Sequence, residues 1–274
     1  MTKVWFITGA SRGLGRATVE AALQSGASVV ATARNPESLN EFTEKFGAAK
    51  FLPLALDVTN AAQVASAVEA GHEKFGRLDV IVNNAGYANV AAIEDIDISD
   101  FRTQLDTNFM GVVYVTKAVL PILRQQGSGH IFQVSSVGGR VGNPGLSAYQ
   151  SAKWAVGGFS TILAAEVTPF GIKVTVLEPG GMNTDWAGSS MNIPPVSEPY
   201  KPTVGTVAEM LRKYNGHAPS QTEKVAQIMI QLSDADDVPL RLLVGPDAVD
   251  FGGKALQALV ESDKKWHDLS ISSV

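Results

Sequence analysis

The chain has 274 residues, of which 45% are hydrophobic and 18% are charged, and its formal net charge is −5. These values are typical of a globular protein with a sizeable core, and without a basic run they give no reason to expect nucleic acid or an anionic membrane as a partner. Cysteine is absent, which excludes disulfides, thiolate metal sites and thiol nucleophiles.

The remaining composition also points away from metals and membranes. The histidines show no metal-ligand spacing, so we interpret them as structural or surface residues and expect no metal site; they are His72, His130, His217 and His267. No apolar run reaches the length of a membrane span, and no signal-peptide pattern is present. We therefore expect a cytoplasmic protein, and residues 1–274 are predicted to form one domain because no linker or repeat interrupts them.

The first predicted element is a strand over Val4–Thr8, an apolar run that suits burial on both faces of a parallel sheet. A glycine-rich turn follows it and leads into a helix over Ala17–Gln24. Strand, glycine turn and helix in that order place backbone N–H groups and a positive helix end beside a phosphate. The turn therefore predicts dinucleotide binding through Gly9, Ser11, Arg12, Gly13, Leu14 and Gly15.

The second predicted strand, Ser28–Ala33, ends at Arg34 rather than at an acidic residue. In dinucleotide folds an acid at this point binds the ribose 2′-hydroxyl, whereas an arginine accommodates a 2′-phosphate. Arg12 is placed to reach the same phosphate, and two guanidiniums suit a dianion. The pair favours NADP over NAD; the alternative is that both arginines are ordinary surface charges.

A polar helix is predicted around Pro36–Phe46 and a third strand around Phe51–Leu56, followed by Asp57 and Val58. Asp57 suits a hydrogen bond from an adenine amino group. The alternative is that it caps a helix over Thr59–Phe75, since aspartate is a common N-cap.

The fourth predicted strand, Asp79–Val82, leads into small and amide residues that leave backbone free to face a ligand, namely Asn83, Asn84, Ala85 and Gly86. The next predicted helix, Ser99–Gln125, carries Asn108 and Gly111 in its interior. Both residue types are poor helix formers, and such a local violation is typical of a functional site.

The fifth predicted strand, His130–Val134, ends in Ser135 and Ser136, and a loop then returns the chain to Tyr149. If a helix begins there, Tyr149 and Lys153 stand at i and i+4 on one face. A free tyrosine titrates near pH ~10, and a neighbouring cation would lower its pKa toward neutrality. Such pairs also occur on ordinary solvated helix faces, but the surrounding motifs favour an acid.

After a sixth predicted strand, Lys173–Leu177, the segment Asp185–Gln221 is the one long stretch without clean periodicity. Such segments are typically lids or binding loops. Its apolar and aromatic residues favour a hydrophobic substrate. The chain is completed by a helix over Thr222–Ser233, a strand over Leu240–Val244 and a helix over Lys254–Trp266.

In this order the motifs resemble those of the short-chain dehydrogenase/reductase family, from Thr8 to about Thr184 and in outline beyond. The resemblance implies an α/β fold, a Rossmann-type doubly wound parallel seven-stranded sheet of order 3-2-1-4-5-6-7 with helices on both faces. It assigns cofactor contacts to the glycine turn and to Arg34, Asp57, Val58, Asn84, Ala85, Gly86, Tyr149, Lys153, Pro179, Gly180, Met182 and Thr184.

The resemblance also implies four catalytic roles. Tyr149 gives its proton to the developing alkoxide while NADPH supplies a hydride, and Ser136 donates a hydrogen bond to the same oxygen. Lys153 lowers the Tyr149 pKa and binds the nicotinamide ribose, and Asn108 holds a water that resupplies protons. Ser136 has the family's usual distance from Tyr149, but a role for Ser135 stays open.

The expected activity is therefore an NADP-dependent oxidoreductase that acts on a hydrophobic ketone, aldehyde or secondary alcohol, more often as a carbonyl reductase, with its direction and natural substrate open. A catalytically silent NADP sensor that signals to a partner is the alternative, and the complete tetrad argues against it. An epimerase or dehydratase would need a larger C-terminal domain. Family members pair through helices that correspond to Ser99–Gln125 and Ala148–Val167, so a homodimer or homotetramer is expected.

Overall fold

The computed structural model describes residues 2–184, 186, 190–214 and 218–273. His217 and parts of the predicted lid, including Asp185, lie outside these residues. Among the described residues, no helix combines the length and the apolarity that crossing a bilayer requires.

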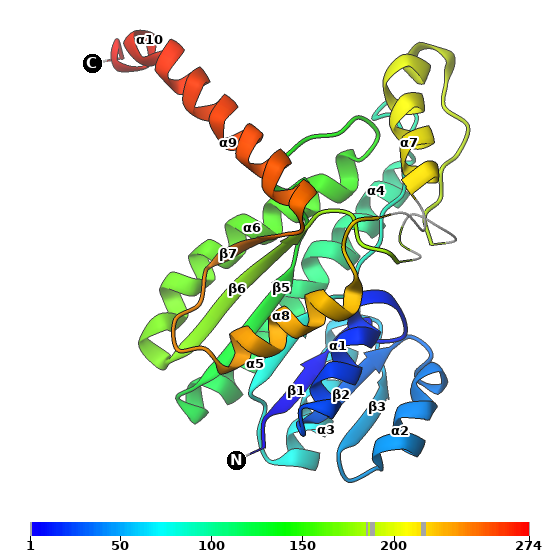
Figure 1. Ribbon diagram of the computed structural model, residues 1–274, viewed down its shortest axis with the longest axis vertical. Coiled ribbons are helices and arrows are strands. Elements are labelled where there is room, and N and C mark those ends of the chain that lie inside the picture. Colours follow the sequence, from blue (N-terminus) through cyan, green and yellow to red (C-terminus); the bar gives the residue numbers. More distant parts are fainter. Residues whose placement is uncertain (1, 185, 187–189, 215–217, 274) are drawn as a thin grey trace.

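The fold is a seven-stranded parallel sheet with the order β3-β2-β1-β4-β5-β6-β7, which confirms the predicted topology (Figure 1). The strands are β1 Val4–Ile7, β2 Ser28–Ala33, β3 Phe51–Ala55, β4 Val80–Asn83, β5 Gly129–Val134, β6 Ile172–Pro179 and β7 Arg241–Val244. The central strands are buried on both faces, because successive side chains point alternately into two separate cores. Trp5 and Ile7 of β1 belong to one core, and Val4 and Phe6 belong to the other.

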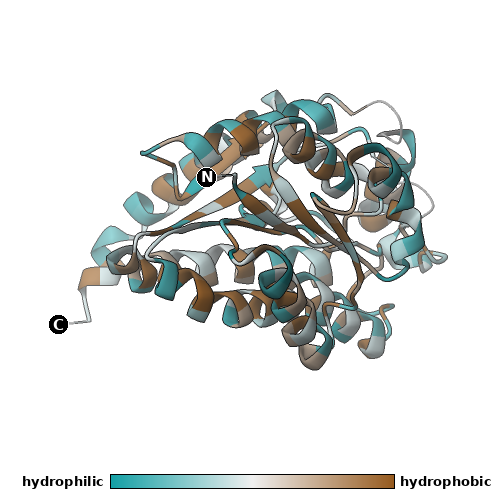
Figure 2. Cartoon of the chain, turned by 90° about the horizontal axis from the view of Figure 1, so that it is seen from below, coloured by the Kyte–Doolittle hydropathy of each residue, from teal (hydrophilic) through white to brown (hydrophobic). Residues whose placement is uncertain are grey.

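Helices cover both faces of the sheet, as Figure 2 shows. The first core is closed by α1 Gly13–Gln24, α2 Asn40–Phe46 and α8 Thr222–Asp234. The second is closed by α3 Ala61–Phe75, α5 Gly111–Gln126 and α6 Ser147–Val167. The short elements are η1 Pro36–Leu39, η3 Val137–Gly139, η4 Thr168–Phe170, η6 Glu198–Tyr200 and η7 Lys201–Gly205.

Two predicted helix boundaries were wrong at the N-terminal end. The first helix begins at Gly13, inside the glycine turn, and the last one, α9, spans Pro246–Lys265 and so begins eight residues before Lys254. Pro246 at the first helical position and Asp247 in the first turn suit a helix start, but Gly252 and Gly253 hide the helical pattern that follows. A short helix, α10 His267–Ile271, follows α9.

The predicted helix Ser99–Gln125 is divided into three pieces. They are α4 Ile98–Leu105, a π-helical turn η2 Asp106–Met110, and α5.

The lid region is also more regular than predicted, since α7 Thr206–Tyr214 is helical. In addition, α3 is capped by Asn60, whose side chain accepts hydrogen bonds from the backbone of Ala62 and Gln63, so the N-cap alternative for Asp57 was wrong.

Candidate active site

The candidate site lies at the carboxyl edge of the sheet. β1 pairs with β2 on one side and with β4 on the other, so the chain leaves this edge in opposite directions from neighbouring strands. A crevice at such a switch point is the usual ligand site of doubly wound sheets. The predicted glycine loop, the 84–86 segment, the serines and the 179–184 loop all follow strands that end here.

The glycine loop after β1 tolerates no side chain at two positions. A Cβ on Gly9, whose φ is +64°, would lie 2.8 Å from the Ala85 Cα, and one on Gly15 would run into the Gly9 carbonyl oxygen. α1 begins at Gly13 without a side-chain cap and without an acidic residue in its first turn. Its N–H groups and positive end therefore fit an anion such as the pyrophosphate of a dinucleotide.

Thr8 joins the glycine loop to the segment after β4. Its hydroxyl accepts hydrogen bonds from the backbone of Asn84 at 3.0 Å and of Ala85 at 3.1 Å. The Asn84 side chain donates in return to the carbonyl oxygens of Thr8 and Gly9, at 3.0 and 3.1 Å. Asn84 is thus bonded within the protein, and its effect on a ligand is to fix the two loops relative to each other.

Asn108 is fully buried in the π turn, and its side chain explains why the helix is interrupted there. Its amide donates to the Gln104 carbonyl at 2.8 Å and to the Tyr87 carbonyl at 2.9 Å, and its oxygen accepts from the Tyr87 backbone at 3.2 Å. A Cβ on Gly86 would lie only 2.5 Å from that oxygen. Asn108 therefore holds the segment after β4 directly against the helix.

The two serines after β5 have different surroundings. The buried Ser135 hydroxyl donates to the Lys153 carbonyl at 3.1 Å, so it joins β5 to α6. The Ser136 hydroxyl accepts a hydrogen bond from the Gly138 backbone at 3.0 Å, which makes Ser136 the N-cap of η3. Ser136 is the serine whose hydroxyl lowers the pKa of Tyr149, and this hydroxyl also donates to the Pro179 carbonyl at 3.5 Å.

Tyr149 and Lys153 lie in the first two turns of α6 and are 7% and 4% exposed. The Lys153 ammonium is 5.6 Å from the centre of the Tyr149 ring and donates to the Val134 carbonyl at 2.8 Å. The predicted convergence of a phenol, an ammonium and the Ser136 hydroxyl is therefore present in the fold.

The pKa values of this pair follow burial rather than charge. Burial raises the pKa of Tyr149 to about 12, although its hydrogen bond with Ser136 acts in the opposite direction. Burial also lowers the pKa of Lys153 to about 8. The sequence predicted a lowered tyrosine pKa, but desolvation of the phenolate is the largest effect here, so Tyr149 is a protonated acid at neutral pH.

The lid segment packs over the tyrosine. The ring of Trp186 lies 5.2 Å from that of Tyr149, centre to centre. Both belong to a separate apolar cluster that joins the segment after β4 to the lid and includes Val90, Leu146, Met191, Val204 and Leu211. Apolar side chains therefore form the surroundings of the phenol on the lid side.

The loop after β6 approaches both the glycine loop and the start of α9. The Gly180 N–H donates to the Val244 carbonyl at 3.0 Å, and the Gly181 N–H donates to the Asp247 carboxylate at 2.7 Å. A Cβ on Gly13 would lie 3.2 Å from the Thr184 methyl group. Pro179 is the last residue of β6, and Met182 packs on the first core.

The residues predicted to read the adenosine half are exposed at the β1–β3 side. Arg12 is the N-cap of α1, and Arg34 directly follows β2. The Arg34 charge acts on the pKa of Tyr87, which places this arginine at the same end of the sheet as the 84–86 segment. Asp57 is exposed, and its carboxylate accepts from the Thr59 backbone and hydroxyl at 2.9 and 2.8 Å. Val58 beside it is buried against Gly111.

Sequence reasoning missed three residues that shape this edge. They are Thr8, which joins two loops, Asp247, which binds the loop after β6, and Glu178, whose carboxylate is completely buried. A charged residue at the end of an apolar strand is itself a signal, and Glu178 has that position in β6.

Comparison with known proteins gives the same family over most of the chain. Residues 3–192 match the family model described as short chain dehydrogenase. An oxidoreductase of Botryotinia fuckeliana, BOA17, is 65% identical over 273 residues, which is 100% of both chains. A 3-ketodihydrosphingosine reductase of Bacteroides thetaiotaomicron is 35% identical over 96% of this chain and 93% of its own.

Solved structures agree with this result. A short-chain dehydrogenase from Streptomyces avermitilis superposes with a TM-score of 0.93 at 34% identity, covering 100% of both chains. A serine dehydrogenase solved with NADP+ has a TM-score of 0.77 at 28% identity, covering 89% of this chain and 94% of its own. The family match, the identity to oxidoreductases and the parallel sheet with its glycine loop together show that this chain belongs to the short-chain dehydrogenase/reductase family of oxidoreductases.

Proposed function

We propose that the protein is an NADP-dependent carbonyl reductase that interconverts hydrophobic ketones or aldehydes and secondary alcohols. The observation that carries the proposal is the convergence of three groups from the end of β5 and the first two turns of α6. The Ser136 hydroxyl lies near enough to the Tyr149 phenol to lower its pKa, and the Lys153 ammonium lies one helical turn from the phenol on α6. A silent sensor would have no need of this convergence.

The proposed chemistry assigns one task to each residue. The bound nicotinamide supplies the hydride in the reductive direction. Tyr149, which is protonated at neutral pH, gives its proton to the substrate oxygen. The Ser136 hydroxyl donates a second hydrogen bond to that oxygen, where negative charge develops. The Lys153 ammonium stabilises the phenolate that remains, and Asn108 and Lys153 are proposed to hold the water that returns the proton.

The residues at the sheet edge fit a dinucleotide. Gly9 and Gly15 have no side chain in the way, and the N-terminus of α1 has no side-chain cap. Backbone N–H groups are therefore left to bind a pyrophosphate. We propose that Arg12 and Arg34 bind the 2′-phosphate of NADP, because both are exposed at the end of the neighbouring strands β1 and β2. The remaining predicted contacts, from Asp57 to Thr184, extend from this side across the carboxyl edge.

A hydrophobic substrate is proposed from the cluster over Tyr149. Trp186, Met191 and Leu146 place apolar surface next to the phenol, which suits an alkyl or aryl group beside the carbonyl better than a polyol. The 35% identical relative named 3-ketodihydrosphingosine reductase supports a ketone with a long apolar part. We propose residues 185–221 as the lid of a single domain that spans residues 1–274.

The experiment that tests the function removes the phenolic hydroxyl. Tyr149→Phe should lower reduction of a hydrophobic ketone about 1,000-fold, within the usual range for a general acid, while NADPH binding followed by its fluorescence changes little. Tyr114→Phe on α5 is the matched control and should keep full activity. A Tyr149→Phe enzyme that turns over normally would refute the proposal.

We also propose a homodimer or homotetramer that pairs through α5 and α6. The outer side of α6 and the turn after it expose Ile162 and Phe170, which are 64% and 43% accessible. α9 extends away from the sheet (Figure 1) and carries exposed Leu256 and Leu259, so it lies in the way of a second interface near β7. This position favours the dimer.

A further inference from the structure

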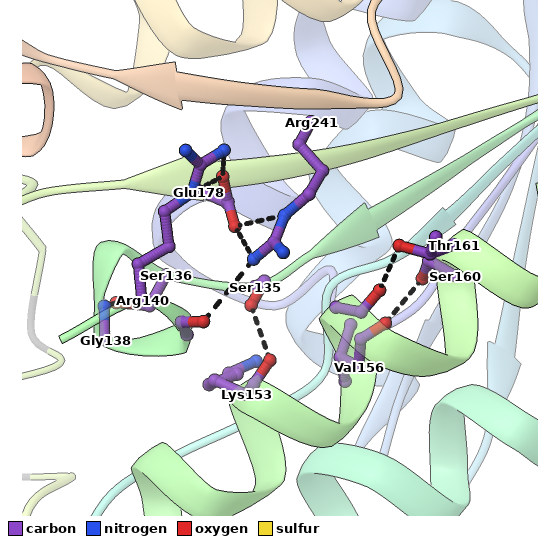
Figure 3. A network of polar contacts seen from close by, with 12 residues as sticks. Ser135, Ser136, Gly138, Arg140, Lys153, Val156, Ser160, Thr161, Glu178 and Arg241 are labelled. Atoms are coloured by element: carbon purple, nitrogen blue, oxygen red, sulfur yellow. Dashed lines mark hydrogen bonds and ion pairs between the residues drawn. The ribbon is translucent and has the colours of Figure 1, made fainter. Parts of the chain in front are cut away.

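Glu178 is a charged residue with no exposed surface, close to the end of β6. Its carboxylate accepts hydrogen bonds from the Nε atoms of two arginines, Arg140 at 2.7 Å and Arg241 at 2.9 Å, and it forms ion pairs with both. Figure 3 shows the two guanidiniums approaching the carboxylate from different elements. Each oxygen of Glu178 therefore has its own arginine.

The two arginines connect Glu178 to the turn that begins at Ser136. Arg140 directly follows η3, and Arg241 is the first residue of β7 and donates a further hydrogen bond to the Gly139 carbonyl at 3.4 Å. Within the turn, the Gly138 and Gly139 N–H groups donate to the hydroxyl and the carbonyl of Ser136, at 3.0 and 2.8 Å. The orientation of the Ser136 hydroxyl thus depends on a turn that is held at its far end by Glu178.

The same group also contacts the helix that carries the acid. A Cβ on Gly157 would lie 3.0 Å from the Arg241 guanidinium, and one on Gly139 would lie 2.9 Å from the Lys153 carbonyl. Tyr149, Lys153 and Gly157 are four residues apart and share one face of α6. Arg241 therefore lies between the Ser136 turn and the face of α6 that carries the proposed acid.

A contribution to stability is a weak explanation for burying a carboxylate with two arginines. Removing a carboxylate from water offsets most of its attraction to the arginines, and well-packed apolar residues would serve a core as well. An ion pair has directional hydrogen bonds, however, which fix the relative positions of three backbone segments more closely than apolar packing does. Residues that hold reacting groups to within about 0.5 Å are typically locked in this way.

We propose that Glu178 is a positioning residue, which acts through Arg140 and Arg241 to set the Ser136 hydroxyl against Tyr149. Glu178 does not touch the reacting atoms, and its effect on turnover is transmitted by the η3 turn. The inference rests on the proposed function insofar as Ser136 is taken as a hydrogen-bond donor in the reaction.

The test is a double-mutant cycle on turnover of a hydrophobic ketone at saturating NADPH. Ser136→Ala should lower kcat about 100-fold, as the loss of one oxyanion donor does. Glu178→Gln should lower kcat about 10-fold, with the dissociation constant for NADPH unchanged within about 2-fold. Because both substitutions act on one hydrogen bond, the kcat of the double variant should stay within about 3-fold of the kcat of Ser136→Ala.

The matched control breaks an arginine–carboxylate pair at the opposite edge of the sheet. Asp79 pairs with Arg77 and accepts from the Val4 backbone just before β4 begins. Asp79→Asn alters stability at the start of β4, away from Ser136. Any effect that it has on kcat should therefore be independent of Ser136→Ala, so that the two fold-changes multiply in the double variant. The pH dependence of alcohol oxidation is a second readout. Its midpoint should move to higher pH in Glu178→Gln as it does in Ser136→Ala, because the Ser136 hydrogen bond lowers the Tyr149 pKa.

If Glu178→Gln does not fold, Arg140→Gln takes its place in the cycle, because it leaves Glu178 paired with Arg241, and Arg140→Lys should restore part of the lost kcat. Independent, multiplying effects of Glu178 and Ser136 on kcat would overturn the positioning role while leaving the proposed function intact. An unchanged kcat in Ser136→Ala would instead refute the role proposed for Ser136 and this inference together.

Discussion

At the scale of single residues, Tyr149 shows how burial and charge compete for one proton. Lys153 directs its ammonium to the Val134 carbonyl, 2.8 Å away, rather than to the phenol oxygen. Its charge therefore does not offset the loss of solvent around the phenolate, and the tyrosine pKa is raised. The phenol is therefore protonated at neutral pH, as the reductive direction requires.

Lys153 gives a prediction about stability and pH. Its folded pKa of about 8 lies below the ordinary 10.5, so between these values the unfolded chain binds more protons and stability rises with pH. The buried charge therefore lowers the unfolding free energy by about 3 kcal/mol at pH 7, and the hydrogen bond from the ammonium raises it by about 1 kcal/mol. Lys153→Met should raise the unfolding free energy at pH 7 by about 2 kcal/mol, while abolishing activity.

The gain in Lys153→Met should shrink above pH 8 and be lost before pH 10.5, because the folded wild-type lysine is by then neutral while the unfolded one still binds a proton. Urea unfolding at several pH values measures this difference. The exposed Lys117 on α5 is the control, and Lys117→Met should leave stability unchanged at every pH. A gain that stays constant with pH would contradict the buried charge.

Arg34 gives a prediction about cofactor choice. If its guanidinium binds the 2′-phosphate, Arg34→Asp should lower kcat/KM with NADPH about 10- to 100-fold, the usual effect of losing a charge-assisted hydrogen bond. The kcat/KM with NADH should change little or rise, since aspartate can bind the 2′-hydroxyl. Arg124→Asp, in the last turn of α5, is the control. An unaltered ratio of the two kcat/KM values would exclude this contact.

At the scale of elements, the break between α4 and α5 depends on one side chain. The Asn108 amide donates to the Gln104 carbonyl, an acceptor that a regular α-helix would pair with the Asn108 backbone N–H. The resulting π turn places the Asn108 oxygen against Gly86 and the Tyr87 backbone. The poor helix formers in this segment mark the position where the helix is interrupted, but the turn itself requires the partner segment after β4.

The lid gives a prediction at this scale. Because burial is the largest cause of the raised Tyr149 pKa, and the Trp186 ring lies on that residue, Trp186→Ala should lower this pKa. The pH midpoint of alcohol oxidation should therefore fall, and KM for hydrophobic ketones should rise about 10-fold as apolar contact is lost. Met210→Ala, at an exposed position of α7, should change neither quantity. An unmoved pH midpoint would show that Trp186 does not control access of water to the phenol.

At the scale of the whole molecule, the exposed apolar residues suggest how copies associate. Ile162→Glu should convert the proposed oligomer toward monomer, because it places a charge in the contact between α6 helices. Light scattering after size-exclusion chromatography measures the mass. Ile93→Glu, in the segment after β4, where the isoleucine is 65% exposed, is the control and should leave the mass unchanged. A monomeric wild-type chain, or an oligomer that survives Ile162→Glu, would exclude pairing through this face.

The sequence by itself determined the buried parallel strands, the glycine turn and the pairing of Tyr149 with Lys153, because these depend on local patterns: apolar runs, glycines for close backbone approach, and an i, i+4 pair on a helix. Such patterns can be recognised without knowing which segments pack against them. The order of the strands and the choice of Ser136 came from the family resemblance that these motifs carry.

Only the tertiary structure decided the direction of the Tyr149 pKa, the different partners of Ser135 and Ser136, and the burial of Glu178 between two arginines. All three depend on which segments, far apart in the chain, meet at the carboxyl edge of the sheet. Desolvation and hydrogen bonding are set by those neighbours, and they outweigh the charge of a residue four positions away.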